Sequence, residues 1–254
     1  MSGRLAVIGL GPGDARYLTP EADAELRDAE ALYGYTRYLE RISPREGQAR
    51  HASDNREERT RAAAALRAAA QGARVAIVSG GDPGVFAMAA AVCEEIEHGP
   101  GSFRALDVTI VPGVTAMLAA AARVGAPLGH DFCALSLSDN LKPWDVIERR
   151  LDAAAGAGFV IALYNPMSQS RPWQFSRAME RLAGLLPPAT PVIFGRAVGR
   201  ADETVTVTTL DRAGSEHADM ATLVIVGSRE TRLVHRAGRT PLVYTPRAVA
   251  EVSV

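Results

Sequence analysis

The sequence predicts an α/β fold of two domains, the first built on a mainly parallel sheet and the second on a mixed sheet. Short β-branched runs alternate with helical patterns in the first half, and such alternation places parallel strands in one sheet covered by helices. A Gly/Pro-rich stretch over 124–130 interrupts this rhythm, so we expect domains at 1–123 and 124–254. In the second half, two late strands leave no room for a helix between them, which predicts antiparallel pairing.

Hydrophobic periodicity and helix-boundary residues define the elements of the first domain. The expected strands are 5–8, 31–35, 74–78 and 106–111, and the expected helices are 20–29, 55–71, 85–96 and 114–123. Thr19 before Pro20 is a good helix start, because threonine caps and a first-turn proline loses no hydrogen bond. Gly72 is a plausible helix stop.

The second domain shows the same kinds of pattern. Its expected strands are 132–137, 159–164, 192–194, 205–208 and 223–226, with helices over 144–155 and 172–186. The terminal stretch 229–254 is the part of the chain whose pattern is least clear.

Composition excludes several classes of protein. A chain of 254 residues with 47% hydrophobic content buries a sizeable core without covalent staples. Cys93 and Cys133 lie in apolar stretches with no CxxC spacing, which favours buried, reduced thiols and a reducing compartment. The apolar run 85–93 is too short to span a bilayer, and no basic leader is present, so we expect a cytoplasmic protein that does not engage a membrane.

Charge and histidine spacing give no sign of nucleic-acid or metal binding. The net charge of −1 provides no field to attract nucleic acid, and none of the familiar nucleic-acid-binding motifs occurs. The five histidines show no mutual spacing typical of metal ligands. We therefore expect no nucleic-acid partner and no bound metal.

The first glycine-bearing turn, 9–14 (GLGPGD), follows the first strand. Closely spaced glycines allow a sharp turn and a close backbone approach to a ligand. Asp14 stands where a dinucleotide fingerprint has its third glycine, and the helix starts only near Pro20, so that fingerprint does not fit. This turn alone is either a ligand site or a tight structural turn.

Two further turns, 79–86 (SGGDPGVF) and 112–116 (PGVTA), also follow strands. The carboxylate of Asp82 suits a ligand ammonium or hydroxyl group, and the alternative is that Asp82 caps the next helix. Because open α/β sheets bind ligands at the carboxyl ends of their strands, three turns at three strand ends predict one crevice along one sheet edge.

The set GLGPGD, SGGDPGVFA and VPGVTA, in this order and spacing, resembles the signature of the tetrapyrrole methylases over essentially the whole chain. The resemblance implies a homodimeric methyltransferase that binds S-adenosyl-L-methionine in a cleft between two α/β domains. Carried over position by position, it implies that the cofactor is bound by Leu10, Pro12, Gly81, Asp82, Val85, Phe86, Thr115 and Ala116, and in the second domain by Asn165, Ala197, Thr222 and Leu223.

One departure from the family pattern concerns Gly34. In the members that methylate uroporphyrinogen, an aspartate thought to act as a base follows the second strand, and Gly34 stands at the matching place. This departure argues against the uroporphyrinogen reaction.

The segments 136–144 (SLSDNLKPW) and 162–173 (ALYNPMSQSRPW) resemble the branch of the family that methylates C17 of precorrin-3B, or of its cobalt-bearing counterpart. That branch implies ring contraction to precorrin-4. Each segment places a cation, Lys142 or Arg171, two positions before a tryptophan, Trp144 or Trp173. A cation and a flat ring suit a conjugated substrate with carboxylates, whereas the alternative is that the tryptophans pack the domain core.

Other assignments stay open at this stage. Tyr33, Tyr35 and Arg37 are further candidates for substrate contacts, although a half-buried strand end has the same pattern. No catalytic base can be derived, and Asp139, Tyr33 and His130 are the conceivable ones. Two rival functions remain: a methylase with the same cofactor turns that acts on RNA or protein, and a non-catalytic nucleotide-binding module.

Overall fold

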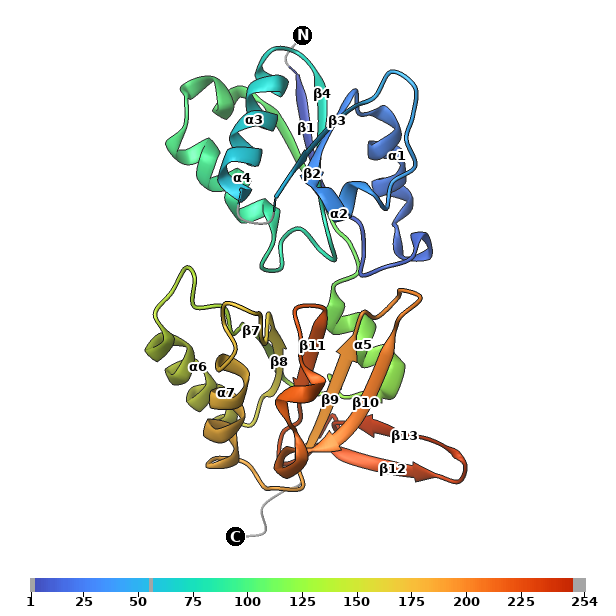
Figure 1. Cartoon of the computed structure of the whole chain (residues 1–254), viewed down its shortest axis with the longest axis vertical. Helices are drawn as coiled ribbons and strands as arrows, with labels where there is room; N and C mark the ends of the chain where they lie inside the picture. Colours follow the sequence, from blue (N-terminus) through green and yellow to red (C-terminus); the bar gives the residue numbers. More distant parts are fainter. Residues whose placement is uncertain (1–2, 55–56, 249–254) are drawn as a thin grey trace. The chain divides into compact units, whose positions relative to one another are not determined.

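Residues 3–54 and 57–248 are described in a computed structural model, and the chain divides into two units, Met1–Thr115 and Ala116–Val254 (Figure 1). The division lies before helix α5 (Ala116–Val124), whereas the sequence places the boundary after it. The α5 helix belongs to the second unit because it packs on that unit's sheet: a Cβ added to Gly195 would lie 2.7 Å from the Cβ of Ala120.

The first unit is built on five parallel strands in the order β3-β2-β4-β1-β5. The strands are β1 (Arg4–Gly9), β2 (Ala31–Tyr35), β3 (Ala49–Ser53), β4 (Arg74–Ser79) and β5 (Asp107–Val111), and the helices are α1 (Pro20–Asp28), α2 (Thr36–Leu39), α3 (Glu58–Ala70) and α4 (Met88–His98). Because every neighbouring pair is parallel, the carboxyl ends of all five strands lie at one edge. The predicted parallel sheet is confirmed, although the sequence patterns missed β3 and α2.

The two faces of this sheet carry separate cores. Leu5 and Val7 of β1 face α3 and α4, while Ile8 faces α1 and α2, as the two-residue period of a strand requires. All three side chains are fully buried. Burying an aliphatic side chain of this size contributes about 1.5–3 kcal/mol, so the alternation in β1 alone fixes the strand between its helices.

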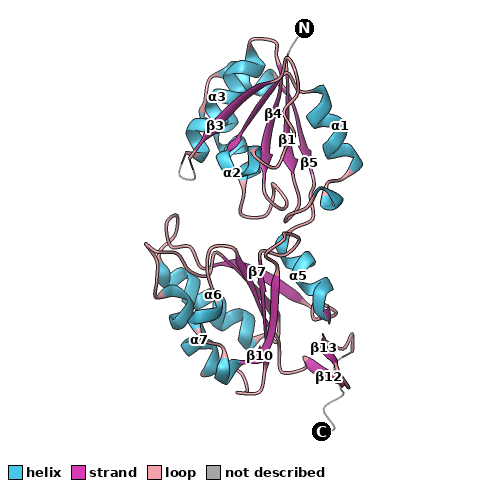
Figure 2. Cartoon of the chain, turned by 45° about the vertical axis from the view of Figure 1, so that its right-hand side comes forward, coloured by secondary structure: helices cyan, strands magenta, loops and turns pink. Residues whose placement is uncertain are grey.

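The second unit has a mixed sheet in the order β10-β9-β11-β8-β7, which confirms the second predicted sheet. Its strands are β7 (Phe132–Ser136), β8 (Val160–Tyr164), β9 (Pro191–Arg196), β10 (Thr204–Thr209) and β11 (Thr222–Val226). Strands β7 and β8 are parallel, whereas β11 is antiparallel to both β8 and β9. Helices α6 (Trp144–Gly156) and α7 (Gln174–Ala183) lie on one face of the sheet and α5 on the other (Figure 2).

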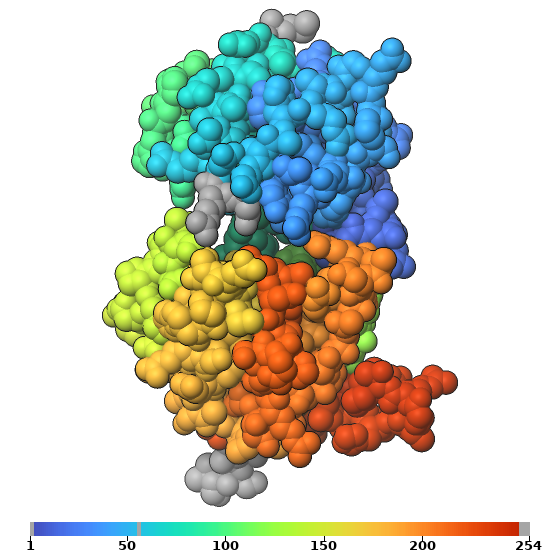
Figure 3. All heavy atoms as spheres, in the orientation of Figure 1, coloured from blue at the N-terminus to red at the C-terminus, as the bar shows by residue number. Residues whose placement is uncertain are grey.

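A hairpin of β12 (Arg232–Arg236) and β13 (Arg239–Tyr244) follows this sheet and protrudes from the second unit (Figure 3). Strand β13 pairs with β6 (Gly125–Ala126), so part of the Gly/Pro-rich stretch 124–130 forms a short strand. The hydroxyl of Thr245 donates a hydrogen bond of 2.6 Å to the carbonyl of Pro127. The sequence patterns did not predict this hairpin. Residues 249–254 lie outside the described residues.

The expected helix boundaries in the first unit are confirmed at two places. The Thr19 hydroxyl accepts a 3.1 Å hydrogen bond from the Ala22 N–H at the start of α1, and Gly72 adopts a φ of +100° just after α3. The helix predicted from residue 55 begins at Glu58, and positions 55–56 lie outside the described residues.

The two cysteines differ from the expectation of buried thiols. Cys93 is exposed, because in α4 its neighbour Val92 occupies the buried face. Cys133 is half-buried, and burial raises the pKa of its thiol. Across residues 3–54 and 57–248, no helix is both long and apolar enough to cross a membrane, and no cluster of His, Cys, Asp or Glu is arranged to hold a metal ion.

Gly34 is required by the packing of β2 against its neighbours. A Cβ at this position would lie 2.5 Å from a methyl group of Val78 and 3.2 Å from Leu39 Cγ. The side of β2 that an aspartate would occupy here is the buried one, against the core under α2. The structure thus gives a packing reason for the departure from the uroporphyrinogen-methylating pattern.

We expect Gly34→Asp to lower the free energy of unfolding by about 2–5 kcal/mol, because it overpacks the core and buries a carboxylate. Urea denaturation would measure the change. Gly101→Asp is the matched control, since an added Cβ at Gly101 has no neighbour within 4 Å. Equal stability of the two variants would contradict this account of the packing.

Candidate functional site

The three predicted glycine turns meet at the carboxyl edge of the first unit's sheet. Gly11 in the first turn and Gly81 in the second exchange both of their backbone hydrogen bonds, at 3.1 and 2.9 Å. The second turn is tied to the third by a 3.0 Å bond from the Gly113 N–H to the Asp82 carboxylate. The prediction that the turns converge is therefore confirmed within this unit.

The turns come this close only because glycine occupies the contact positions. A Cβ on Gly113 would lie 2.3 Å from the carbonyl oxygen of Gly81, and one on Gly9 would lie 2.7 Å from the Gly113 nitrogen. Gly11 and Gly81 also adopt φ values of +68° and +67°, which side chains disfavour. The three turns therefore pack backbone against backbone at this edge, with no side chain between them.

The carboxylate of Asp82 connects two of the turns. One oxygen accepts a 2.8 Å hydrogen bond from the Gly84 N–H, and the other accepts the bond from Gly113. The alternative role as a helix cap is wrong: α4 begins after Ala87, and no side-chain hydrogen bond caps it. Asp82 therefore organises the second and third turns.

The other predicted cofactor residues of this unit differ in what they present. Leu10 and Thr115 are buried, and the side chain of Leu10 packs in the core. Phe86 is 51% exposed and has a φ of +51°. Such a conformation costs about 1–3 kcal/mol for a non-glycine residue and is typical of functional sites. Pro12 and Val85 are half-buried.

A second set of strained residues lies at one edge of the second unit's sheet. Asn165 and Ala197, with φ values of +51° and +49°, follow β8 and β9, and Thr222 begins β11, which runs the other way. The amide of Asn165 donates a 3.0 Å hydrogen bond to the Ser136 hydroxyl. The strand directions thus bring the predicted residues of this unit to one edge. Leu223 is buried, so its side chain packs in the protein.

Arg171 is placed differently from the expectation. Its side chain was predicted to offer a cation to substrate carboxylates, but the residue is only 6% exposed. Its guanidinium donates to the carbonyl oxygens of Leu137 at 3.4 Å and Asn165 at 3.3 Å. Burial lowers the pKa of the guanidinium, while the charge of Asp139 raises it. Arg171 therefore holds the loops after β7 and β8 together.

The two tryptophans form an edge-to-face pair with ring centroids 4.8 Å apart. Trp144 is partly buried against the core, which agrees with the alternative that the tryptophans pack the domain core. Its indole N–H donates a 3.0 Å hydrogen bond to Glu148. Trp173 is 47% exposed and keeps an accessible ring. Lys142 is half-buried, and burial, with a smaller effect of Arg150, lowers the pKa of its ammonium group.

The three conceivable bases occupy different places. Asp139 follows β7 at the edge that carries Asn165, and its carboxylate accepts hydrogen bonds of 3.2 and 3.0 Å from the Gln174 amide. His130 precedes β7, at the opposite end of that strand. Tyr33 lies in the middle of β2 with its ring stacked on His51 at 4.3 Å, and burial raises the pKa of its phenol. Only Asp139 lies with the second set of candidate residues.

The remaining predicted substrate residues lie where β2 passes into α2. Tyr35, the last residue of β2, contacts Tyr38 edge-to-face at 5.4 Å between centroids, and Arg37 is exposed.

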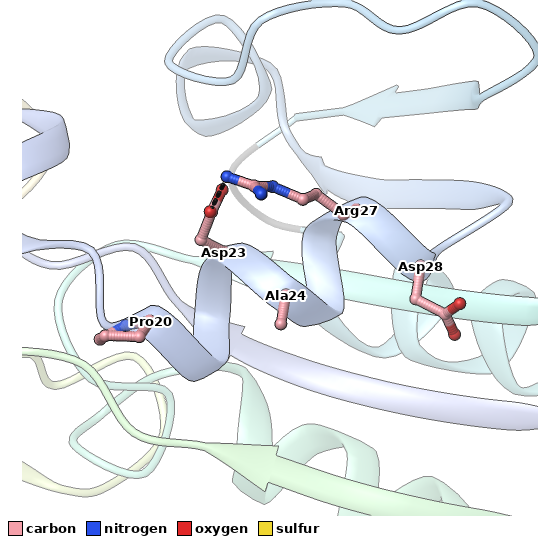
Figure 4. A pocket seen from close by; sticks show the side chains of 5 residues that line it. All are labelled: Pro20, Asp23, Ala24, Arg27 and Asp28. Carbon is pink, nitrogen blue, oxygen red and sulfur yellow. Dashed lines mark hydrogen bonds and ion pairs between the residues drawn. The ribbon is translucent and has the colours of Figure 1, made fainter.

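A separate surface depression follows α1, where Asp23 and Arg27 form an ion pair (Figure 4). Its lining comes from this one helix and includes no residue of the glycine turns, so we do not regard it as the site.

Sequence reasoning missed two residues that contact the glycine turns, Tyr38 and Arg41. Arg41 donates hydrogen bonds to three carbonyl groups of the first turn, and the Tyr38 ring lies against Gly80 of the second. Neither residue stands in a glycine motif, so no local signal in the sequence marks them.

Comparisons with known proteins identify the family of the chain. The family model "Tetrapyrrole (Corrin/Porphyrin) Methylases" matches residues 4–214. A "Precorrin-3B C(17)-methyltransferase" from Sinorhizobium sp is 60% identical over 253 residues, covering 100% of both chains. A "Probable cobalt-factor III C(17)-methyltransferase" from Salmonella typhimurium is 41% identical, covering 95% of this chain and 99% of the relative. The crystal structure of the methyltransferase CobJ is 51% identical with a TM-score of 0.91, covering 96% and 100% of the two chains.

The chain therefore belongs to the tetrapyrrole (corrin/porphyrin) methylase family, whose members use S-adenosylmethionine, and it is a methyltransferase. The names of both these relatives contain the term C(17)-methyltransferase.

We expect Asp82→Ala to raise the dissociation constant for S-adenosylhomocysteine about tenfold or more, because two backbone N–H groups lose their acceptor and the turns separate. Losing such an acceptor costs about 1–3 kcal/mol. Isothermal titration calorimetry measures the affinity. Asp107→Ala is the control, since its side chain is 67% exposed. An unchanged affinity in Asp82→Ala would remove this carboxylate from the organisation of the site.

We expect Arg171→Ala to lower the free energy of unfolding by about 2–4 kcal/mol, because it removes a buried charged donor and leaves a cavity. The affinities for the cofactor and for the tetrapyrrole should fall together, as both depend on the loop that holds Asn165. Denaturation and two separate titrations give these values, with Arg177→Ala, a substitution of a half-exposed arginine on α7, as control. Weakened substrate binding at full stability would restore Arg171 as a direct anchor.

Proposed function

We propose that the chain methylates C17 of precorrin-3B with S-adenosyl-L-methionine and couples this step to ring contraction, giving precorrin-4 in cobalamin biosynthesis. The observation that carries the proposal is the 60% identity, over the full length of both chains, with the precorrin-3B C(17)-methyltransferase of Sinorhizobium sp. The segments 136–144 and 162–173, with their cation and tryptophan patterns, support the same assignment.

The residues at the converged turns fit the cofactor. An added Cβ at Gly9 or Gly113 would collide with the backbone of a neighbouring turn, so the turns meet with no side chain between them, and the exposed ring of Phe86 offers apolar surface on the second turn. We assign the cofactor contacts in the first unit to Pro12, Gly81, Val85, Phe86, Thr115 and the backbone of Leu10, and in the second unit to Ala116, Asn165, Ala197, Thr222 and the backbone of Leu223. Asp82 acts by shaping the turns.

In this reaction the main task of the protein is to align the acceptor carbon with the methyl group. S-adenosylmethionine, when bound, supplies a methyl group already activated by its sulfonium. The protein must hold the acceptor carbon in line with that methyl, and such positioning contributes up to about 7–11 kcal/mol in favourable systems. Rigid turns fixed by paired backbone hydrogen bonds suit this task because they do not have to reorganise when the ligand binds.

The tetrapyrrole is recognised through its rim carboxylates and its flat ring. Arg37 and Lys142 are the cations that we assign to the carboxylates, and the exposed ring of Trp173 is the surface that we assign to the macrocycle. Trp144 supports Trp173 from behind. Tyr35 adjoins Arg37, and we assign Tyr33 as a wall residue because its half-buried ring stacks on His51.

Asp139 is the residue that we propose as proton acceptor for ring contraction. The reaction implied by the family moves a proton from the C20 hydroxyl, which requires a base or a polarising contact. The amide of Gln174, a residue only 2% exposed, donates to both carboxylate oxygens of Asp139 and fixes their position. His130 lies at the other end of β7 and is not proposed for this role.

A cobalt-bearing ring is the second candidate substrate, because the Salmonella typhimurium relative named for cobalt-factor III is 41% identical over nearly the whole chain. The higher identity to the relative named for precorrin-3B favours the metal-free ring. Nothing observed favours an RNA or protein substrate or a non-catalytic nucleotide-binding role. A cytoplasmic homodimer that takes no nucleic acid or membrane partner stays a prediction.

Incubation with radiolabelled S-adenosylmethionine and each candidate ring tests the assignment. We expect label to enter precorrin-3B, with a product of the mass of precorrin-4, and slower or no transfer to the cobalt-bearing ring. Uroporphyrinogen III and bulk RNA serve as negative substrates. The variant Asp139→Asn should bind both ligands within about twofold of wild type and lose contraction. Transfer to RNA, or none to either corrin precursor, would overturn the proposal.

A further inference from the structure

The first glycine turn is held from outside by one arginine. The Arg41 guanidinium donates from a single nitrogen, Nη2, to the carbonyl oxygens of Leu10 at 2.9 Å, Gly11 at 3.0 Å and Gly13 at 2.6 Å. Hydrogen bonds from a charged donor are about twice as strong as neutral ones, and a positive charge offsets the repulsion among three converging carbonyl dipoles. The carbonyl side of the turn is thereby fixed in one conformation.

The same short segment also contacts the second turn. Tyr38 lies in α2, three residues before Arg41, and a Cβ on Gly80 would lie 2.7–2.9 Å from its ring carbons and hydroxyl oxygen. Tyr38 and Arg41 are joined by a 3.2 Å bond from the Arg41 N–H to the Tyr38 carbonyl. Residues three apart on a helical turn share one side, so one helical turn places two side chains on two different glycine turns.

We propose that Arg41 is a positioning residue that holds the first glycine turn in the conformation that binds S-adenosylmethionine, with Tyr38 fixing the second turn from the same helical segment. The inference rests on the proposed function of these turns as the cofactor site. Arg41 contacts no reacting atom: it acts through the carbonyl groups of Leu10, Gly11 and Gly13.

The planar guanidinium explains why arginine stands at this position. Its Nη2 carries two hydrogens in a fixed plane on a long stem, so one hydrogen is shared between two of the three carbonyl oxygens. A lysine keeps the charge but offers a compact, strongly hydrated ammonium on a shorter chain. Lysine should therefore restore part of the effect and methionine none of it.

The test compares Arg41→Met and Arg41→Lys with wild type and with Arg45→Met, which removes an exposed arginine from the same loop. We expect Arg41→Met to raise the dissociation constant for S-adenosylhomocysteine, and KM for S-adenosylmethionine, about tenfold to a hundredfold. KM for the tetrapyrrole should stay within about twofold. Arg41→Lys should fall between Arg41→Met and wild type, and Arg45→Met should match wild type.

Hydrogen exchange without ligand gives a readout that needs no activity. Amides of residues 9–14 should exchange faster in Arg41→Met than in Arg45→Met, with the second unit unchanged. Unchanged exchange, or an unchanged affinity, would overturn the inference, as would equal rises in KM for both substrates. Failure of the wild-type chain to bind S-adenosylhomocysteine would instead refute the proposed function, so the two failures are distinguishable. If Arg41→Met does not fold, Arg41→Lys carries the same comparison.

Discussion

Close backbone contact among three glycine turns is the constraint on which the site depends. The order β4-β1-β5 places the turns after three adjacent parallel strands, and the paired hydrogen bonds of Gly11 and Gly81 join two of them. Gly9 and Gly113 leave no room for a Cβ where the turns meet, and Gly81 adopts a φ of +67°. The parallel sheet places the three turns next to one another, and the lack of side chains on the glycines lets their backbones come into contact. The side chains of Asp82 and Arg41 then hold these turns in place.

Arginines organise the candidate edges of both units by binding carbonyl groups. Arg41 does so in the first unit and Arg171 in the second, where it holds the carbonyl of the strained Asn165. Loops in left-handed conformations turn carbonyl groups away from their usual partners, and a guanidinium satisfies several at once. Methyl transfer from an activated donor needs few reactive side chains, so most polar residues at these edges serve geometry.

The motifs predicted the first unit's edge well, because strand direction and glycine spacing are local properties. Prediction was weaker for strands that are charged or exposed, because these strands lack apolar alternation. The β12–β13 hairpin carries Arg232, Arg236 and Arg239 and pairs with only two residues of β6, so no apolar alternation marks it. Arg171 was misjudged because a cation near a tryptophan has the same pattern whether it faces solvent or the protein.

The sequence by itself determined that three glycine turns share one sheet edge, since βα alternation fixes strand direction and therefore which ends coincide. It also placed the chain among the tetrapyrrole methylases. Only the tertiary structure decided which polar side chains serve the protein and which remain available to a ligand. Arg41 donates to the carbonyl of Leu10, and Asp82 accepts from the N–H of Gly113; each pair is 31 residues apart in the sequence. Such pairs depend on tertiary packing, which no local pattern encodes.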